Sequence, residues 1–198
     1  MKEFWDERYA VGEFVYGYEP NEFFASSLGP GYKQKLLLPG EGEGRNAIYA
    51  ASQGWLVHAF DQSETAAAKA VGFALNRNLR IEYEINDCAH FDITDNYYDA
   101  VGLIFLHLPP DVRKKFHTGL SHRIKKSGRI IGEFFAEQQI SLNSGGPRDP
   151  SLLYTVKELQ ENFRDLNILL LEEKMIQIKE GEYHNGLASV IRFIGVRE

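Results

Sequence analysis

The chain has 198 residues, of which 43% are hydrophobic, 25% charged and 13% aromatic, the composition of a globular protein rather than a disordered or fibrous one. Its 22 basic and 28 acidic residues give a net charge of −6, which disfavours a general nucleic-acid binder because phosphate neutralisation needs a basic surface. One cysteine, Cys88, excludes an internal disulfide framework and a Cys-rich zinc site. No apolar run has the length of a membrane span or a signal peptide, so we expect a cytoplasmic protein with no membrane partner.

We expect one domain over residues 1–198, in which residues 1–30 form an aromatic-rich N-terminal decoration or lid. The central part alternates short apolar runs with amphipathic segments, which is typical of β-α-β units around a parallel sheet. The pattern predicts helices over 45–53, over 63–76 and from Pro109, the last with Val112, Phe116 and Leu120 as its buried stripe. It predicts strands over 36–38, 55–60, 81–85, 99–106 and up to Phe135 after Gly128.

The last third of the chain has a different pattern. Residues 138–151 contain glycines, prolines and serines and are interpreted as a mobile loop. Thr155 and Glu158 form a capping box, which predicts a helix to about Phe163. Residues 168–178 and 188–196 are rich in β-forming residues and are joined by a short Gly-containing connection, which predicts an antiparallel hairpin.

A glycine repeat follows the first predicted strand. Gly40, Gly42 and Gly44 lie between that strand and a helix, where glycine permits positive φ and a close approach of the backbone to a ligand. Asp61 ends the second predicted strand, where an acidic side chain can accept hydrogen bonds from ribose hydroxyls. The alternative is that the three glycines only form a tight turn and that Asp61 only caps the following helix.

The spacing of the repeat separates the classes of nucleotide site. The dinucleotide fingerprint G-x-G-x-x-G would need a glycine at position 45, which is Arg45, and no Gly-Lys-Ser/Thr of a P-loop follows. The G-x-G-x-G pattern instead resembles motif I of class I S-adenosylmethionine-dependent methyltransferases. The run from Gly44-Arg45-Asn46-Ala47 to Asp61-Gln62-Ser63 is similar to that of tellurite-resistance-type and thiopurine-type small-molecule methyltransferases.

This resemblance extends over nearly the whole chain. It includes Trp5-Asp6-Glu7-Arg8-Tyr9 near the N-terminus, Asn86-Asp87-Cys88-Ala89 after the third strand and the run from Tyr98 to Leu108. It implies an α/β Rossmann-like three-layer α-β-α sandwich with a mostly parallel seven-stranded sheet and an antiparallel C-terminal strand. It implies S-adenosylmethionine as cofactor, a small-molecule methyl acceptor and an activity of class EC 2.1.1.-. The cofactor-binding residues it implies are Tyr16, Gly40, Glu41, Gly42, Gly44, Asn46, Asp61, Gln62, Asp87, Cys88, Ala89 and Leu106.

One position departs from the family pattern. The family usually has an acidic residue two positions before the first glycine, and this chain has Leu38. Glu41 is a candidate to take over part of that polar contact, with a solvated side chain as the alternative. The departure keeps a second reading open, a non-catalytic module that binds the cofactor and regulates a partner. A nicotinamide-dependent oxidoreductase is a further alternative, which the position of the third glycine and the antiparallel ending disfavour.

The six histidines show no metal-ligand spacing with Cys or carboxylate partners, so we expect no metal. His107 ends the fourth strand and is a candidate general base, with a structural imidazole as the alternative. Methyl transfer from a sulfonium relies mainly on proximity and alignment, and no clearly paired base is visible. We therefore expect a soft or already deprotonated nucleophile; the sequence leaves the acceptor's identity and the oligomeric state open.

Overall fold

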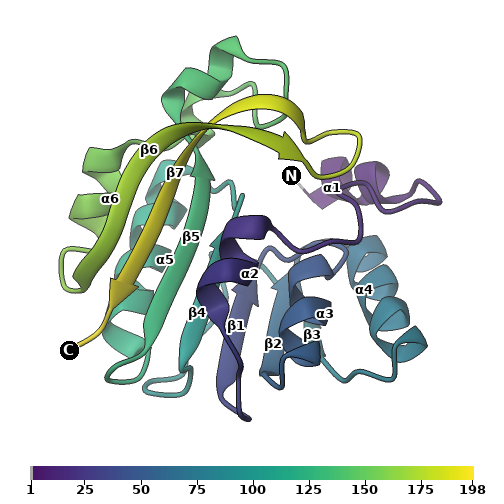
Figure 1. The fold of residues 1–198 in the computed structure, drawn as a ribbon, viewed down its shortest axis with the longest axis horizontal. Helices are drawn as coiled ribbons and strands as arrows, with labels where there is room; N and C mark the ends of the chain where they lie inside the picture. The colour runs from purple at the N-terminus through teal and green to yellow at the C-terminus, as the bar shows by residue number, and fades with distance from the viewer. Residues whose placement is uncertain (1) are drawn as a thin grey trace.

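The computed structural model describes residues 2–198, which contain a seven-stranded sheet in the order β3-β2-β1-β4-β5-β7-β6 (Figure 1). Strands β1 to β5 pair in parallel, and β7 is antiparallel to both β5 and β6, as predicted. The strands are β1 Lys35–Pro39, β2 Leu56–Asp61, β3 Glu82–Ile85, β4 Ala100–Ile104, β5 Arg129–Phe135, β6 Asn167–Lys179 and β7 Asn185–Val196.

Helices cover both faces of the sheet and confirm the three-layer arrangement (Figure 1). One layer contains α2 Glu22–Leu28, α3 Arg45–Ser52 and α4 Glu64–Asn76. The other contains α5 Pro110–Arg123 and α6 Val156–Asn162, while α1 Lys2–Tyr9 lies against α4. Part of the N-terminal region therefore lies in a main layer, because Phe24 and Leu28 of α2 are fully buried against the sheet.

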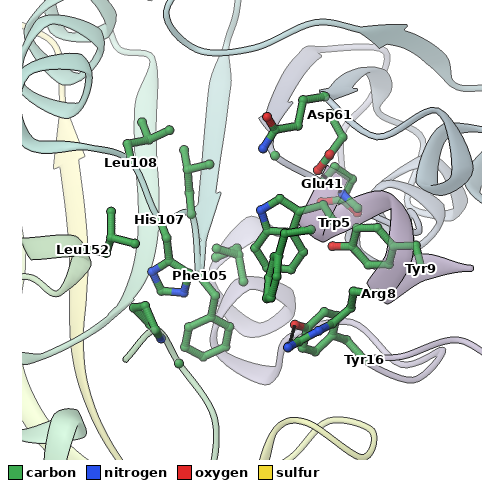
Figure 2. A pocket seen from close by; sticks show the side chains of 18 of the residues that line it. Trp5, Arg8, Tyr9, Tyr16, Glu41, Asp61, Phe105, His107, Leu108 and Leu152 are labelled. Carbon is green, nitrogen blue, oxygen red and sulfur yellow. Dashed lines mark hydrogen bonds between the residues drawn. The ribbon is translucent and has the colours of Figure 1, made fainter. Parts of the chain in front are cut away.

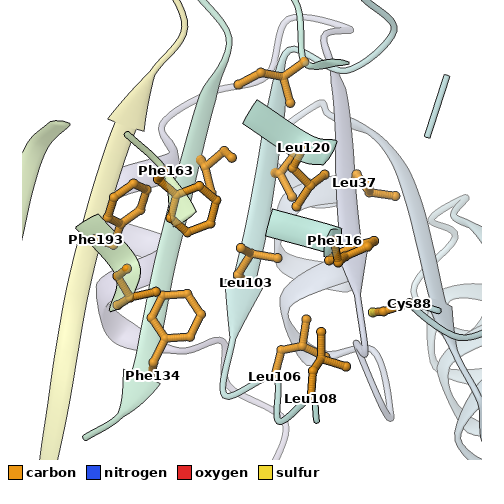
Figure 3. Packing of buried hydrophobic residues seen from close by; sticks show 14 of the residues in the cluster. Leu37, Cys88, Leu103, Leu106, Leu108, Phe116, Leu120, Phe134, Phe163 and Phe193 are labelled. Carbon is orange, nitrogen blue, oxygen red and sulfur yellow. The ribbon is translucent and has the colours of Figure 1, made fainter. Parts of the chain in front are cut away.

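The larger core lies between the sheet and the layer of α5 and α6 (Figure 3). Phe116 and Leu120 of α5 and Phe163 after α6 pack there against Leu103 and Phe193 of the sheet. Burial of a large apolar side chain contributes about 1.5–3 kcal/mol, so this cluster fixes the position of α5 behind the strand ends. Val112, the third member of the predicted stripe, packs against the same cluster but is only half-buried, because it also lines a cavity.

Local signals in the sequence account for the helix ends. The Ser63 hydroxyl accepts a hydrogen bond from Ala66 N at 3.1 Å, and the Thr155 hydroxyl accepts one from Glu158 N at 3.0 Å. Such caps satisfy backbone donors that have no partner within the helix. The Asn21 side chain caps α2 in the same way, by accepting from Phe24 N at 2.9 Å.

Two predicted segments differ from the structure. The strand predicted over 99–106 ends at Ile104, because Phe105 has φ +48° and turns the chain out of the sheet. The segment predicted as a loop over 138–151 includes the ends of two short 3-10 helices, Glu137–Ser141 and Pro150–Leu152. Among the described residues, no helix has both the length and the apolar character that a membrane span requires.

The strand order reverses between β1 and β4, which lie side by side while their connections lead to opposite sides of the sheet. In open α/β sheets the crevice at the carboxyl ends of such a strand pair is the usual ligand site. The glycine repeat follows β1 and the segment from Phe105 follows β4, so both border this crevice.

Candidate cofactor and acceptor site

A cavity of about 770 Å³ lies at the carboxyl ends of β1, β2 and β4 (Figure 2). The predicted site residues converge on it from segments far apart in the sequence. Gly44 is the exception, because it caps α3 and does not line the cavity. The lining includes Tyr16, Gly40, Glu41, Gly42, Asn46, Asp61, Gln62, Asp87, Cys88, Ala89, Leu106 and His107.

The glycine loop is held by the end of the neighbouring strand. Asp61 accepts hydrogen bonds from Gly42 N at 3.1 Å and from Ser63 N at 2.9 Å. Gly42 has φ +61°, and a Cβ at this position would lie 2.7 Å from the Tyr9 hydroxyl. Gly44 has φ +89°, and a Cβ there would lie 2.7 Å from Ala70 Cβ, so this glycine allows α3 and α4 to approach.

Burial raises the pKa of Asp61, and the two amide hydrogen bonds oppose that rise. The carboxylate therefore carries a desolvation cost that a further pair of hydroxyl donors would reduce. Tyr83 supports the same loop from β3, because its hydroxyl donates to the Gly42 carbonyl at 2.6 Å. The alternating sequence pattern of this strand did not predict the hydrogen bond.

Glu41 lies on the cavity wall and is not a solvated side chain. Its carboxylate accepts from Ala47 N at 2.7 Å and from Asn46 Nδ2 at 3.3 Å. Burial raises the pKa of Glu41 to about 7, although these hydrogen bonds favour the charged form. A cationic group of a ligand placed beside Glu41 would favour its ionised form.

The segment after β3 forms another wall. The Asp87 carboxylate accepts from Ala89 N at 2.8 Å and from His90 N at 3.1 Å, so it stabilises its own turn. Cys88 belongs to the large apolar core, and burial raises the pKa of its thiol. Phe60, Leu108 and Val112 add apolar surface to the cavity at this end.

The opposite end of the cavity is aromatic. Phe105 stacks on Phe135 with ring centroids 4.4 Å apart and meets the His184 ring edge-on at 4.8 Å. Burial and the nearby His184 lower the pKa of His107 to about 3, and its Nδ1 has no hydrogen-bond partner among the described residues. His107 is therefore neutral at pH 7 and is a weak base.

A buried polar network supports this end. Arg45 donates to Glu180 at 2.7 Å, and Asn21 Nδ2 donates to Glu133 at 2.7 Å and to Glu180 at 3.0 Å. Burial alone would raise the pKa of Glu180, but Arg45 and His184 lower it to about 2. The network joins α2, α3, β5 and the hairpin connection, so it fixes the hairpin relative to the glycine loop.

The N-terminal segment lies along one side of the cavity (Figure 2). Trp5 stacks on Tyr9 with centroids 5.6 Å apart, and Arg8 donates to the Tyr16 hydroxyl at 3.3 Å. Tyr16 was predicted at this site from its sequence context, whereas Arg8 and Phe105, which also line the cavity, were not. The three-residue spacing of Trp5 and Arg8, which places both on one helix face, was the available signal for Arg8.

One group of possible metal ligands lies away from the cavity, where the register of β2 and β3 brings His58 beside Glu82 and Glu84. Their ligand atoms lie within 4.8 Å of one another. The sequence predicts no metal, and linear spacing does not reveal a group formed across two strands. The Glu84 side chain is 43% exposed, and exposed acidic groups of this kind are common without a bound ion.

Residues 37–128, which include the glycine loop, Asp61 and His107, match the family model described as a methyltransferase domain. Residues 37–128 therefore carry a methyltransferase domain of the S-adenosylmethionine-dependent class. This match supports the methyltransferase over the nicotinamide-dependent alternative, and S-adenosylmethionine is the cofactor of such a domain. A comparison with curated protein sequences gave no match.

Solved structures share the fold of this methyltransferase. TehB from Haemophilus influenzae is 18% identical with a TM-score of 0.73, over 100% of this chain and 67% of TehB. A protein studied for the conversion of a disulfide bond into a thioacetal group during echinomycin biosynthesis is 17% identical with a TM-score of 0.80, over 100% of this chain and 92% of that one. Magnesium protoporphyrin IX methyltransferase from Synechocystis PCC 6803, solved with bound SAM, is 20% identical with a TM-score of 0.59, over 89% and 74%.

The residues present fit S-adenosylmethionine. The cavity wall contains the backbone of the glycine loop, a buried strand-end carboxylate and apolar surface, which are the kinds of group that a nucleoside ligand requires. The volume of about 770 Å³ is within the range of small-molecule sites.

Proposed function

We propose that this methyltransferase acts on a small molecule whose nucleophilic atom is soft or already deprotonated. The supporting observation is the electrostatic state of the aromatic end of the cavity. His107 and His184, the imidazoles there, both have lowered pKa values, so neither is a strong base at neutral pH. A nucleophile that must lose a proton during the reaction would need a better base within hydrogen-bond reach.

The roles of the cofactor-binding residues follow from their positions. In this proposal Asp61 accepts hydrogen bonds from the ribose hydroxyls while it holds the Gly42 amide. Asp87 shapes the turn that receives the adenine, and because Ala89 N already donates to Asp87, Cys88 N is the donor available to the base. Glu41 faces the positively charged amino group of the methionine portion, with Asn46 fixing its carboxylate.

When bound, S-adenosylmethionine supplies a methyl group on a positively charged sulfur, which is already a good leaving group. The chain's own contribution is then to align and enclose the reactants. Leu106 packs beside Gly40, where a Cβ would lie 2.5 Å from its Cδ1, and limits the depth of the cavity. Phe105 and Tyr16 present ring faces and edges to the acceptor and exclude water.

Two measurements test the proposal. Calorimetry with S-adenosylhomocysteine checks the cofactor site, and transfer of a labelled methyl group to thiols, phenols and amines from pH 6 to 9 checks the acceptor. We expect thiols to be preferred, with a rate that follows the thiol's own ionisation, and His107→Gln to lower kcat by less than about tenfold. Preferred methylation of amines or alcohols, with a loss of about 100-fold or more in His107→Gln, would overturn it.

A further inference from the structure

Arg8 differs from the other cationic side chains that line the cavity. Arg45 is ion-paired with Glu180 at 2.7 Å, and Arg148 is exposed and donates to Leu142 O and Asn143 Oδ1, each at 3.2 Å. Arg8 is half-buried, and within residues 2–198 it makes no ion pair; its hydrogen-bond partner is the neutral Tyr16 hydroxyl at 3.3 Å.

The surroundings of Arg8 hold the guanidinium in place without neutralising it. Its Cζ atom lies 4.3 Å from the centroid of the Tyr183 ring and 4.7 Å from that of Phe4. Rings that pack on the faces of a guanidinium fix its plane and leave the N–H donors at its edge available. A guanidinium has five such donors, and one is used here.

The same cation influences its titratable neighbours. Burial lowers the pKa of His184, the hydrogen bond and charge of Glu180 oppose that shift, and Arg45 and Arg8 add to it. Burial raises the pKa of Tyr16, and Arg8 opposes that rise. In both cases the charge of Arg8 acts on a side chain that lines the cavity.

We propose that Arg8, with the Tyr16 hydroxyl beside it, is a carboxylate-binding subsite of this cavity. The geometry suits a carboxylate because the guanidinium edge offers parallel N–H donors to its two oxygens. The carboxylate belongs either to the methionine portion of the cofactor or to the methyl acceptor. The inference deepens the proposed function and rests on it.

The first arm of the test compares S-adenosylhomocysteine with 5′-methylthioadenosine, which lacks the amino-acid end. Binding of both is measured by calorimetry for the unmodified protein, Arg8→Gln, Arg8→Lys and the control Arg164→Gln, since Arg164 is exposed and lies outside the cavity lining. If the cofactor carboxylate is bound, Arg8→Gln weakens the binding of S-adenosylhomocysteine about 10- to 100-fold and leaves that of methylthioadenosine within about twofold. Arg8→Lys recovers part of the loss, and Arg164→Gln has no effect.

The second arm addresses the acceptor. With S-adenosylhomocysteine saturating, binding of 2-mercaptobenzoate is compared with that of 2-mercaptobenzamide. If the acceptor carboxylate is bound, the unmodified protein prefers the acid about fivefold or more, and Arg8→Gln removes the preference while S-adenosylhomocysteine binds normally.

The inference is overturned if Arg8→Gln changes neither the affinity ratio of S-adenosylhomocysteine to methylthioadenosine nor that of 2-mercaptobenzoate to 2-mercaptobenzamide. It is also overturned if the variant weakens the binding of S-adenosylhomocysteine and of methylthioadenosine equally, which would show that Arg8 has a packing role. Failure of the unmodified protein to bind either adenosyl ligand would instead contradict the proposed function itself. The two failures are therefore distinguishable.

Discussion

The Asp61 carboxylate accepts a hydrogen bond of 3.1 Å from the backbone amide of Gly42. This bond ties the end of β2 to the loop that follows β1, although the two residues are 19 positions apart. The carboxylate thus has two tasks, because the group proposed to hold the ribose also holds the loop beside it.

Asp61→Asn should weaken S-adenosylhomocysteine binding about 10- to 100-fold, because hydrogen bonds to a charged acceptor are worth about 1.5–3 kcal/mol. Calorimetry measures the change. Asp149→Asn is the matched control, since Asp149 lines the exposed rim and caps its own turn through Ser151 N at 2.9 Å. Equal affinity of the Asp61 variant and the unmodified protein would rule out the ribose role.

Glu41→Gln should make the stability of the cofactor-free protein less dependent on pH. The pKa of Glu41 is raised from its ordinary value of 4.5 to about 7 in the folded protein, so the folded state binds the extra proton and loses stability as pH rises through this window. Relative to the unmodified protein, the variant should gain about 3 kcal/mol of unfolding free energy between pH 4.5 and 7.5. Urea titrations at both pH values measure this change. If the difference in unfolding free energy between the two proteins is the same at both pH values, the raised pKa of Glu41 is contradicted.

His117→Phe should protect the protein against acid. His117 is fully buried on α5, stacked on Phe163 with centroids 4.7 Å apart, and its Nε2 has no hydrogen-bond partner among the described residues. Burial and Arg113 lower its pKa from 6.5 to about 3, so the unfolded state binds more protons and stability falls as pH drops below 6.5. The unfolding free energy of the variant minus that of the unmodified protein should be about 2 kcal/mol larger at pH 5 than at pH 8.

Removal of residues 2–20 should weaken cofactor binding without unfolding the main core. The apolar contacts of this segment, from Tyr9 and Val15 to Ala66, form a cluster separate from the large core. The deletion also removes Val15 N, which donates to the buried Glu43 at 2.7 Å, so a modest drop in Tm is expected. Circular dichroism and calorimetry on the same sample check both parts, and unchanged affinity would exclude a covering role.

Features that depend on neighbouring residues were predictable from the sequence. The alternation of strands and helices, the Ser63 and Thr155 caps and the glycine repeat all have local causes, and the structure confirms them. Asp61 was predictable as a strand-end acid because parallel strands place their carboxyl ends at one edge.

Features that depend on distant pairing were not predictable. Arg113 is a charged helical residue, yet it is buried, because Glu158 accepts from its Nε at 2.7 Å and its guanidinium lies 4.4 Å from the Tyr154 ring. Its partner lies 45 residues away, and no periodicity reveals such a pair. The pKa of His107 likewise depends on burial and on His184, which belongs to the hairpin connection.

The bond from Asn21 to Glu180 spans 159 residues and joins the start of α2 to the connection between β6 and β7. At the same place the backbone of Gly181 packs so closely on Val15 and Gly17 that a Cβ would clash with both. Closing a loop of this length costs conformational entropy, and the contact can form only when both segments are present. A growing chain therefore completes the enclosure of its ligand cavity only after its last hairpin has been synthesised, and a truncated product would keep the glycine loop while lacking the wall opposite it.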